Sequence, residues 1–180
     1  WTLCNQRMSI KRSKQSSSSS MQYMHTETCL YQFMHANYVK HHIPFYEWEW
    51  LYNLELSKSV SRQTGWQPLY FIAYENEEIC GIAPLFLKNH SYGEFIFDNA
   101  FVHLAQDMGL QYYPKLIGMS PLSPIEGYRF LFAEGVNDRD LTQILISEID
   151  SFAKQNGILI CNFLYVDLDV YFCKTFSCVL

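Results

Sequence analysis

The sequence centres on Pro84-Leu-Phe-Leu-Lys88-Asn-His90-Ser-Tyr92-Gly93-Glu94-Phe-Ile-Phe-Asp98, which lies inside a longer stretch from residue 64 to residue 129. An apolar strand pattern here runs directly into polar and ionisable side chains grouped around a glycine. An apolar triplet closed by a carboxylate follows. Periodicity alone predicts an α/β domain, and the ionisable group marks the place in it where chemistry is expected.

A hairpin of two strands is predicted just before this polar group. Residues 69–74 form an apolar strand pattern after a turn at 64–68, and residues 79–87 form the return strand after the polar loop 75–78. Pro84 has no N–H to donate to a ladder, so we predict an edge position or a bulge there. A strand splayed at this point would leave a gap in which a ligand can reach backbone groups.

Three helices and two further strands complete the predicted fold. Apolar residues recur at helical spacing after Pro44, over residues 44–57, and again over 100–110 up to Gly109. A third helix is predicted from a cap at Asp138 or Asp140 to Gly157. A short strand over 128–132 precedes that helix, and an apolar strand over 158–166 follows it, which is the return half of an α/β unit.

Composition narrows the class of protein. The 180 residues suit one domain, and hydrophobic and aromatic contents of 49% and 17% predict a real core together with a groove or interface. A formal charge of -5 disfavours a broad basic face for nucleic acid. The six cysteines show no zinc-type spacing, so we predict free thiols and no metal site.

The ends of the chain carry little pattern. Residues 1–24 are polar and serine-rich, and we predict a disordered tail there. No apolar run approaches the roughly 20 residues of a membrane helix, and no signal-peptide pattern opens the sequence, so we predict a cytoplasmic protein without a membrane span.

Several motifs, in the same order, resemble the FemAB-like GNAT (acyl-CoA N-acyltransferase) family of peptidoglycan biosynthesis or recognition proteins. They lie at residues 64–68, 81–85, 87–98, 112–116 and 121–129, within a resemblance that covers 44–132. The resemblance implies a GNAT-like α/β fold with a mixed, mainly antiparallel sheet flanked by helices. Family members are usually longer and contain two GNAT-like halves. Residues 25–180 therefore look like a first half, incomplete at its C-terminal end, with the second half as an expected partner.

The resemblance also implies an activity. An N-acyltransferase forms an amide bond between an acyl or aminoacyl donor and an amine-bearing acceptor, here linked to peptidoglycan or cell-wall precursors. The implied co-substrates are acyl-CoA or aminoacyl-tRNA, with a small molecule or peptide as acceptor and no bound cofactor. The sequence lacks the Gln/Arg-x-x-Gly-x-Gly/Ala loop with which acetyltransferases hold a pyrophosphate, and this speaks against acetyl-CoA.

Acyl transfer needs a proton acceptor and a group that stabilises the oxyanion. His90 or Glu94 is the predicted proton acceptor. Lys88 and Lys115 are predicted to bind a carboxylate or phosphate, or to stabilise the oxyanion.

The remaining predicted site residues would bind or position substrate. Tyr92, Tyr112 and Tyr113 would donate hydrogen bonds or stack, and Gly93 would let a substrate approach the backbone. Arg129 would either clamp an anionic group or pair with Glu126, and the sequence does not decide between them.

Each candidate also has a structural explanation. Lys88 and Glu94 would be a solvated pair at the end of the hairpin, Asp98 the cap of the following helix, and His90 a hydrogen-bonded framework residue. The alternative function is a recognition module of the same fold that binds a peptide or cell-wall fragment without turnover. Convergence of His90, Glu94 and Lys115 on one cavity would favour the transferase.

Overall fold

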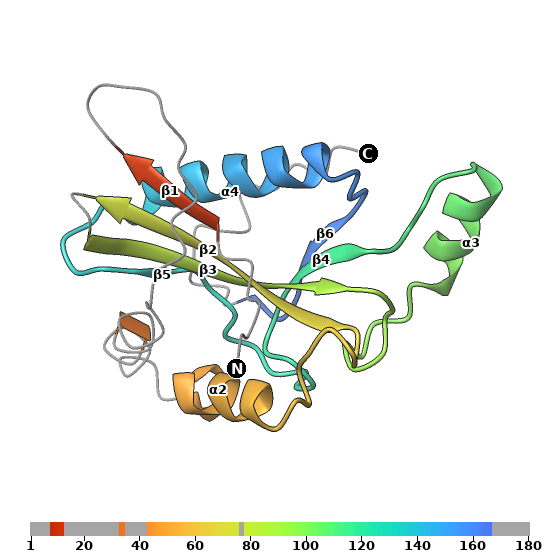
Figure 1. Ribbon diagram of the computed structural model, residues 1–180, viewed down its shortest axis with the longest axis horizontal. Helices are drawn as coiled ribbons and strands as arrows, with labels where there is room; N and C mark the ends of the chain where they lie inside the picture. The colour runs from red at the N-terminus through yellow and green to blue at the C-terminus, as the bar shows by residue number, and fades with distance from the viewer. Residues whose placement is uncertain (1–7, 13–32, 35–42, 76–77, 167–180) are drawn as a thin grey trace.

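The computed structural model describes residues 8–12, 33–34, 43–75 and 78–166 of the chain (Figure 1). Its elements, in order, are β1 (Met8–Arg12), η1 (Pro44–Tyr46), α2 (Trp48–Leu56), β2 (Trp66–Glu75), β3 (Glu78–Lys88), α3 (Asn99–Asp107), β4 (Lys115–Gly118), β5 (Leu131–Phe132), α4 (Asp138–Gln155) and β6 (Cys161–Phe163). Within these residues no helix has the length and apolar character needed to cross a membrane.

The strands form one six-stranded sheet in the order β1-β2-β3-β4-β6, with β5 also paired to β3. The pairs β2·β3, β3·β4 and β3·β5 are antiparallel, whereas β1·β2 and β4·β6 are parallel. The sheet is therefore mixed and mostly antiparallel, as predicted. The parallel pair β4·β6 is joined through α4, as a crossover between parallel strands requires.

Helices cover both faces of the β2·β3 hairpin, which explains why these strands are apolar almost throughout. Successive side chains of a strand point to opposite faces. Tyr70 faces α2, where its hydroxyl donates to the Glu55 carboxylate at 2.6 Å, and Phe71 packs on Phe152 of α4 with 5.6 Å between ring centroids. The predicted helix over 44–57 is divided into η1 and α2 by the extended backbone of Glu47.

The prediction of an edge or a bulge at Pro84 was wrong. Strand β3 lies in the middle of the sheet, and the shift in register falls between Ala73 and Tyr74 of β2. Pro84 is tolerated because it lies between two pairing partners on one side of β3. The strand pairs with β5 at residues 81–82 and with β4 at residues 86–88. The predicted gap is filled by Tyr128, which is buried and donates to the Pro84 carbonyl at 2.8 Å.

The later elements match the predicted ones with corrections at their ends. The cap of α4 is Asn137 rather than either aspartate, because its side chain accepts hydrogen bonds from the backbone N–H groups of Arg139 and Asp140. The predicted strand over 158–166 is limited to β6. Tyr165, with φ of 54°, has left the extended conformation.

Strand β1 lies within the predicted tail. Its five residues pair in parallel with β2, from Met8 opposite Phe71 to Arg12 opposite Glu75. Without β1, the edge of β2 would offer unpaired backbone groups, and β1 satisfies them even though its sequence has little apolar pattern. The other tail residues lie outside the described part of the chain, and a domain boundary near residue 25 stays a prediction.

Candidate functional site

Two buried lysines lie directly opposite each other at one end of the sheet. Lys88 ends β3 and Lys115 begins β4, and the antiparallel register pairs them. Side chains of opposed residues project from the same face, and like charges in that position are destabilising. Because both side chains are fully buried, the fold needs nearby anions to compensate them.

The segment 89–98, between β3 and α3, supplies these anions. The Lys115 ammonium lies 2.6 Å from Glu94 Oε2 and 2.7 Å from Asp98 Oδ2, and Lys88 Nζ lies 3.5 Å from Glu94 Oε1. Glu94 is fully buried and the Asp98 side chain is 6% exposed. We call these two lysines and two carboxylates the buried charge cluster. The pairing of Lys88 with Glu94 is therefore internal, unlike the solvated pair considered from the sequence.

Asp98 is held by three donors. Its Oδ2 accepts hydrogen bonds from Ser91 at 2.6 Å, Lys115 at 2.7 Å and Tyr112 at 2.8 Å. It occupies the N-cap position of α3 but makes no side-chain cap bond, so the prediction of a capping role was wrong. Burial by itself would raise the pKa of Asp98. The hydrogen bonds from Lys115, Ser91 and Tyr112 outweigh that effect and hold the pKa below its ordinary value.

Ser91 and the two tyrosines frame the cluster. Ser91 Oγ accepts from Lys115 Nζ at 2.8 Å and lies 2.7 Å from the Tyr113 hydroxyl. The rings of Tyr112 and Tyr113 meet edge to face, 4.9 Å apart. Burial, together with the hydrogen bond to Asp98, raises the pKa of Tyr112, so its hydroxyl remains a donor. Both tyrosines predicted from the sequence thus lie at the cluster.

Lys88 has an unusual environment for a cation. Its ammonium lies 3.4 Å from the centre of a Trp66 ring and donates to the Tyr92 carbonyl at 2.6 Å. Burial lowers the pKa of Lys88 from 10.5 to about 8, against the opposing effect of the Glu94 carboxylate. This lysine therefore changes charge just above neutral pH.

His90 lies at the rim of the cluster and is hydrogen-bonded at both ring nitrogens. Nδ1 accepts from the Tyr92 backbone N–H at 3.1 Å and lies 3.4 Å from Lys88 Nζ, while Nε2 lies 2.9 Å from the Thr64 carbonyl. These partners suit a ring that donates from Nε2 and accepts at Nδ1. Lys88 lies between His90 and Glu94, and Glu94 in turn contacts Lys115. The contacts of His90 itself are typical of a framework residue.

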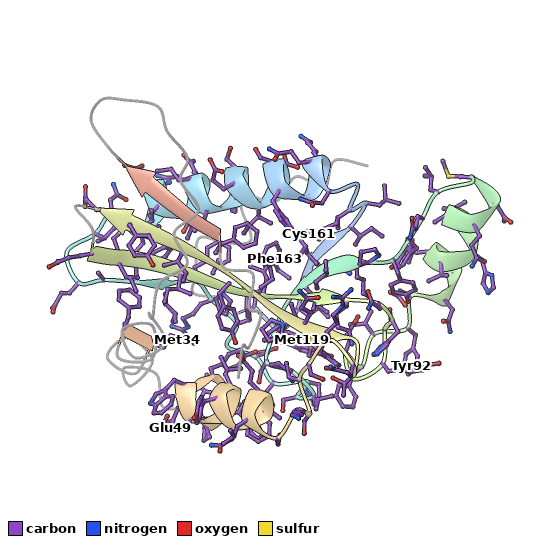
Figure 2. The ribbon with its side chains drawn as sticks, in the orientation of Figure 1. Met34, Glu49, Tyr92, Met119, Cys161 and Phe163 are labelled. Atoms are coloured by element: carbon purple, nitrogen blue, oxygen red, sulfur yellow. The ribbon has the colours of Figure 1, made fainter. Side chains whose placement is uncertain are left out.

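Tyr92 and Gly93, the next two predicted residues, have opposite surroundings: one is exposed and the other enclosed. The Tyr92 side chain is 79% exposed and lies at the edge of the molecule in Figure 2. Gly93 has φ of +80°, and a Cβ there would lie 2.6 Å from Leu122 Cδ2 and 3.3 Å from the Trp66 ring. The space predicted for a substrate next to Gly93 is thus occupied by two side chains of the protein itself.

Arg129 lies beside Tyr46. Its Nε donates to the Gly127 carbonyl at 3.4 Å. Burial raises the pKa of Tyr46 to about 12, although Arg129 acts in the opposite direction. The structure thus joins Lys88, Glu94 and Lys115 with the Tyr112–Tyr113 pair, whereas it places Arg129 in a different environment.

Comparison with known proteins agrees with the motifs in this region. Residues 31–172, most of the chain, match the FemAB-like family, whose description is peptidoglycan biosynthesis/recognition. The chain belongs to this family. The match is wider than the resemblance over 44–132 and contains the whole buried charge cluster. No curated protein and no solved structure matches the chain.

The sequence reasoning missed two members of this FemAB-like site and one support. Ser91 and Asp98 both bind Lys115, and the Tyr165 hydroxyl donates to the Glu94 carbonyl at 2.9 Å. The available signal was the spacing of Ser91, Glu94 and Asp98, which are three and four residues apart with aromatic residues between them. Regular spacing of polar residues among apolar ones predicts that the polar set shares one side of the segment.

One oxygen of each carboxylate lacks a hydrogen-bond donor. Glu94 Oε1 and Asp98 Oδ1 are both buried and make no hydrogen bond. Glu94 Oε1 lies 3.5 Å from Lys88 Nζ, so its partner is the ion pair with this lysine. Buried acceptors are rarely left unpaired. These two oxygens are buried acceptors of the cluster without a hydrogen-bond donor among the described residues.

Metal and pyrophosphate sites fit the described residues poorly. Within them, no three histidine, cysteine, aspartate or glutamate side chains are close enough to hold a metal ion. A pyrophosphate would be expected at the start of α4. There Asn137 already accepts from the free backbone N–H groups, and Asp138 and Asp140 place negative charge in the first turn. A hollow between Asp140 and Glu148 lies on the outer side of the same helix, away from the cluster's face of the sheet.

Proposed function

We propose that this FemAB-like protein is an N-acyltransferase that forms an amide bond between an acyl or aminoacyl donor and an amine-bearing acceptor. The observation that carries the proposal is the pair of buried oxygens that accept no hydrogen bond, Glu94 Oε1 and Asp98 Oδ1. An amine brings the N–H donors that these oxygens lack. The family description supports an acceptor from peptidoglycan chemistry, such as a peptide or a cell-wall precursor.

The architecture supports a GNAT-like fold. An antiparallel hairpin, β2·β3, continues through β4 into a parallel pair with β6, and α4 makes the crossover. This is the order of helices and strands that the sequence shares with GNAT proteins. The cluster lies where β3 and β4 meet, so residues from two neighbouring strands and the segment between β3 and α3 act together.

Each step of the transfer has a group in the cluster. The acceptor nitrogen attacks the acyl carbonyl carbon, and its proton passes to Glu94 while the carbonyl electron pair moves to oxygen. The three N–H groups of Lys115 are engaged by Ser91, Glu94 and Asp98, so the ammonium stabilises that oxyanion by releasing Ser91. The intermediate then expels the oxygen or sulfur of the donor, which takes a proton from Lys88. A pKa of about 8 suits Lys88 to this role, and Glu94, 3.5 Å away, returns the proton to it.

The cluster is covered, so a substrate reaches it when residues 92–93 of the segment 89–98 move outward while Glu94 and Asp98 keep their contacts with Lys115. This segment covers both lysines and carries two left-handed backbone conformations, at Gly93 and at Phe95, whose φ is 61°. Such a conformation is costly for a non-glycine residue. A bound substrate that relieves it would favour the open segment.

The donor is an aminoacyl ester, as in aminoacyl-tRNA, in preference to acyl-CoA. The start of α4 is occupied by Asn137 and made acidic by Asp138 and Asp140, so a pyrophosphate is disfavoured there. No resident cofactor is required by this scheme.

The test is transfer by the full chain, offered a panel of aminoacyl-tRNA and acyl-CoA donors with amine-bearing peptides. Glu94→Gln should reduce kcat by about a hundredfold or more, because the proton acceptor is lost. His90→Ala should have a smaller effect. Asp150→Asn, which alters the exposed pair with Lys154, is the matched control and should leave turnover unchanged. Undiminished turnover in folded Glu94→Gln would exclude this mechanism.

A recognition module is the second candidate, because Tyr92 is 79% exposed next to the His90 ring, 5.1 Å away. Exposed aromatic side chains are frequent anchors for ligands. Binding of peptidoglycan fragments that Tyr92→Ala abolishes, without turnover of any donor, would support recognition. Binding together with turnover that depends on Glu94 would support the transferase.

A further inference from the structure

Tyr165 links the chain just after β6 to the buried charge cluster. Its carbonyl accepts hydrogen bonds from the backbone N–H groups of Gly127 at 2.8 Å and Tyr128 at 2.9 Å. Its hydroxyl donates to the Glu94 carbonyl at 2.9 Å, although the two residues are 71 positions apart in the sequence. One side chain thus connects the end of the sheet's β6 edge to the segment that carries the two carboxylates.

The hydroxyl of Tyr165 holds a part of segment 89–98 that has few other backbone contacts. Within the described part of the chain, no backbone N–H donates to the Glu94 carbonyl, and residues 95–97 make no backbone-to-backbone hydrogen bond. Regions with few such bonds open at a low cost in free energy. The Glu94 backbone therefore depends on Tyr165 for its position.

Two left-handed backbone conformations meet at this hydrogen bond. Phe95 has φ of 61° and Tyr165 has φ of 54°. Such conformations are costly for residues other than glycine, and they persist where the surrounding contacts fix them. The Glu94 carbonyl belongs to the peptide group that joins Glu94 to Phe95, so the bond from Tyr165 fixes that peptide group. At this turn the Glu94 side chain is fully buried, whereas Phe95 is 55% exposed.

We propose that Tyr165 is a positioning residue, whose hydroxyl fixes the Glu94 backbone so that the carboxylate stays between the two lysines of the buried charge cluster. Its effect on turnover rests on the proposed function, in which Glu94 is the proton acceptor. Tyr165→Phe isolates this role. The substitution removes the hydroxyl and leaves in place the carbonyl that accepts from Gly127 and Tyr128.

The distances of the Glu94 carboxylate predict the effect of losing the hydroxyl. Oε2 lies 2.6 Å from Lys115 Nζ, and Oε1 lies 3.5 Å from Lys88 Nζ. When the backbone is released, the short contact with Lys115 should hold and the long contact with Lys88 should lengthen, because attraction falls with distance. The Glu94 carboxylate raises the pKa of Lys88, against burial, which lowers it to about 8. Lys88 should therefore lose its proton at a lower pH in Tyr165→Phe.

The direction of this change separates positioning from a general loosening of the fold. A loosened site would admit water, and weaker desolvation would raise the pKa of Lys88. The other titratable groups around Lys88 are His90, Asp98 and Lys115, and among the described contacts none of them is hydrogen-bonded to Tyr165. A fall in the Lys88 titration therefore reports on Glu94.

The test follows the Lys88 side chain by NMR in the full chain made with isotope-labelled lysine. The Lys88 Cε signal is the one that disappears in Lys88→Met, and in the wild type it should titrate near pH 8. In Tyr165→Phe the midpoint should fall by at least about 0.5 pH, a roughly threefold change in the proton dissociation constant. Tyr46→Phe is the matched control, because the Tyr46 hydroxyl also donates to a backbone carbonyl, that of Ile125 at 2.6 Å, and it should titrate as the wild type does.

Two results would overturn the proposal. One is a Lys88 midpoint that is unchanged or raised in Tyr165→Phe, and the other is an equal fall in Tyr46→Phe. Tyr165 is half-buried and loses a single oxygen atom, so the variant should stay folded, which circular dichroism checks.

Turnover distinguishes this inference from the proposed function. Where the full chain transfers acyl groups, Tyr165→Phe should lower kcat about tenfold and leave KM nearly unchanged, because the position of the proton acceptor is lost and substrate binding is kept. A wild type without turnover would overturn the proposed function, whereas the Lys88 titration would still decide the role of Tyr165. A lowered Lys88 midpoint with undiminished kcat would exclude Glu94 as the proton acceptor and leave its positioning by Tyr165 supported.

Discussion

Replacing Lys115 with methionine should remove the cation that two buried carboxylates share. In the native protein its ammonium lies 2.6 Å from Glu94 and 2.7 Å from Asp98, and the whole side chain is buried. Methionine is similarly long and unbranched, so the packing changes little. The substitution therefore leaves two anions close together in the interior, with Lys88 as the remaining cation of the cluster.

Burial sets the size of the effect. Removing one partner of a buried ion pair costs about 3–5 kcal/mol of unfolding free energy. The chain offers a matched control in Lys154→Met, because Lys154 lies at the same 2.7 Å from Asp150, but these side chains are 76% and 57% exposed. A surface pair of this kind contributes about 0–1 kcal/mol. The two variants should differ by at least about 2 kcal/mol.

The contribution of Asp98 to the pH dependence of stability should also change sign in Lys115→Met. In the wild type the pKa of Asp98 lies below its ordinary value of 3.8, so the unfolded chain binds more protons in acid. That contribution to stability is present above pH 3.8 and is lost as the pH falls through the folded pKa. Without Lys115, burial should raise the pKa of Asp98 above the unfolded value. The folded variant then binds more protons, and its deficit should shrink as the pH falls.

Urea denaturation followed by tryptophan fluorescence measures both quantities. Trp66 is a local reporter, since its ring lies 3.4 Å from Lys88 Nζ. The reasoning is refuted if Lys115→Met loses no more stability than Lys154→Met at neutral pH. It is also refuted if the deficit of Lys115→Met grows on acidification.

Three further predictions concern Lys88 and Gly93 at the site and Asn137 at the start of α4. Burial lowers the pKa of Lys88 from 10.5 to about 8, so between these pH values the unfolded chain binds more protons than the folded one. The contribution of Lys88 to stability should therefore rise with pH in this window. Urea titrations should show the wild type gaining stability relative to Lys88→Met as the pH rises. Gly93→Ala should lose about 1–3 kcal/mol more than Gly109→Ala in thermal denaturation. Both glycines have positive φ, but the new Cβ meets Leu122 only at residue 93. Asn137→Ala should lose about 1 kcal/mol in urea, as expected for a helix cap, and no loss would contradict the capping geometry.

The hairpin and the helices could be predicted from the sequence because their signals are local. The apolar runs at 69–74 and 79–87 lie within β2 and β3, and the helical spacing over 100–110 matches α3. The prediction that failed depended on which strands lie beside β3. The chemistry of Pro84 predicts an edge or a bulge, but the residue is acceptable in the central strand, at the point where the neighbour of β3 changes from β5 to β4.

The site could be predicted only in part. Lys88, Glu94 and Lys115 were named because ionisable groups are conspicuous among apolar residues. Their arrangement depends on the register between β3 and β4, which places Lys88 opposite Lys115 across 27 residues of chain, and a sequence does not display such a register. Asp98 was read as a cap because capping is the commonest use of an aspartate before a helix.

The segment 89–98 departs from ordinary protein design in two ways at once. Its carboxylates, Glu94 and Asp98, are buried, while Tyr92 and Phe97 are 79% and 93% exposed. An apolar replacement of a buried ion cluster is often equally stable or more so, so stability alone does not account for these charges. Exposed aromatic side chains do not stabilise a monomer either. Local departures of this kind are expected where a chain is shaped by function. The inward half of the segment therefore points to chemistry or ligand binding at the cluster, and the outward half to a partner surface.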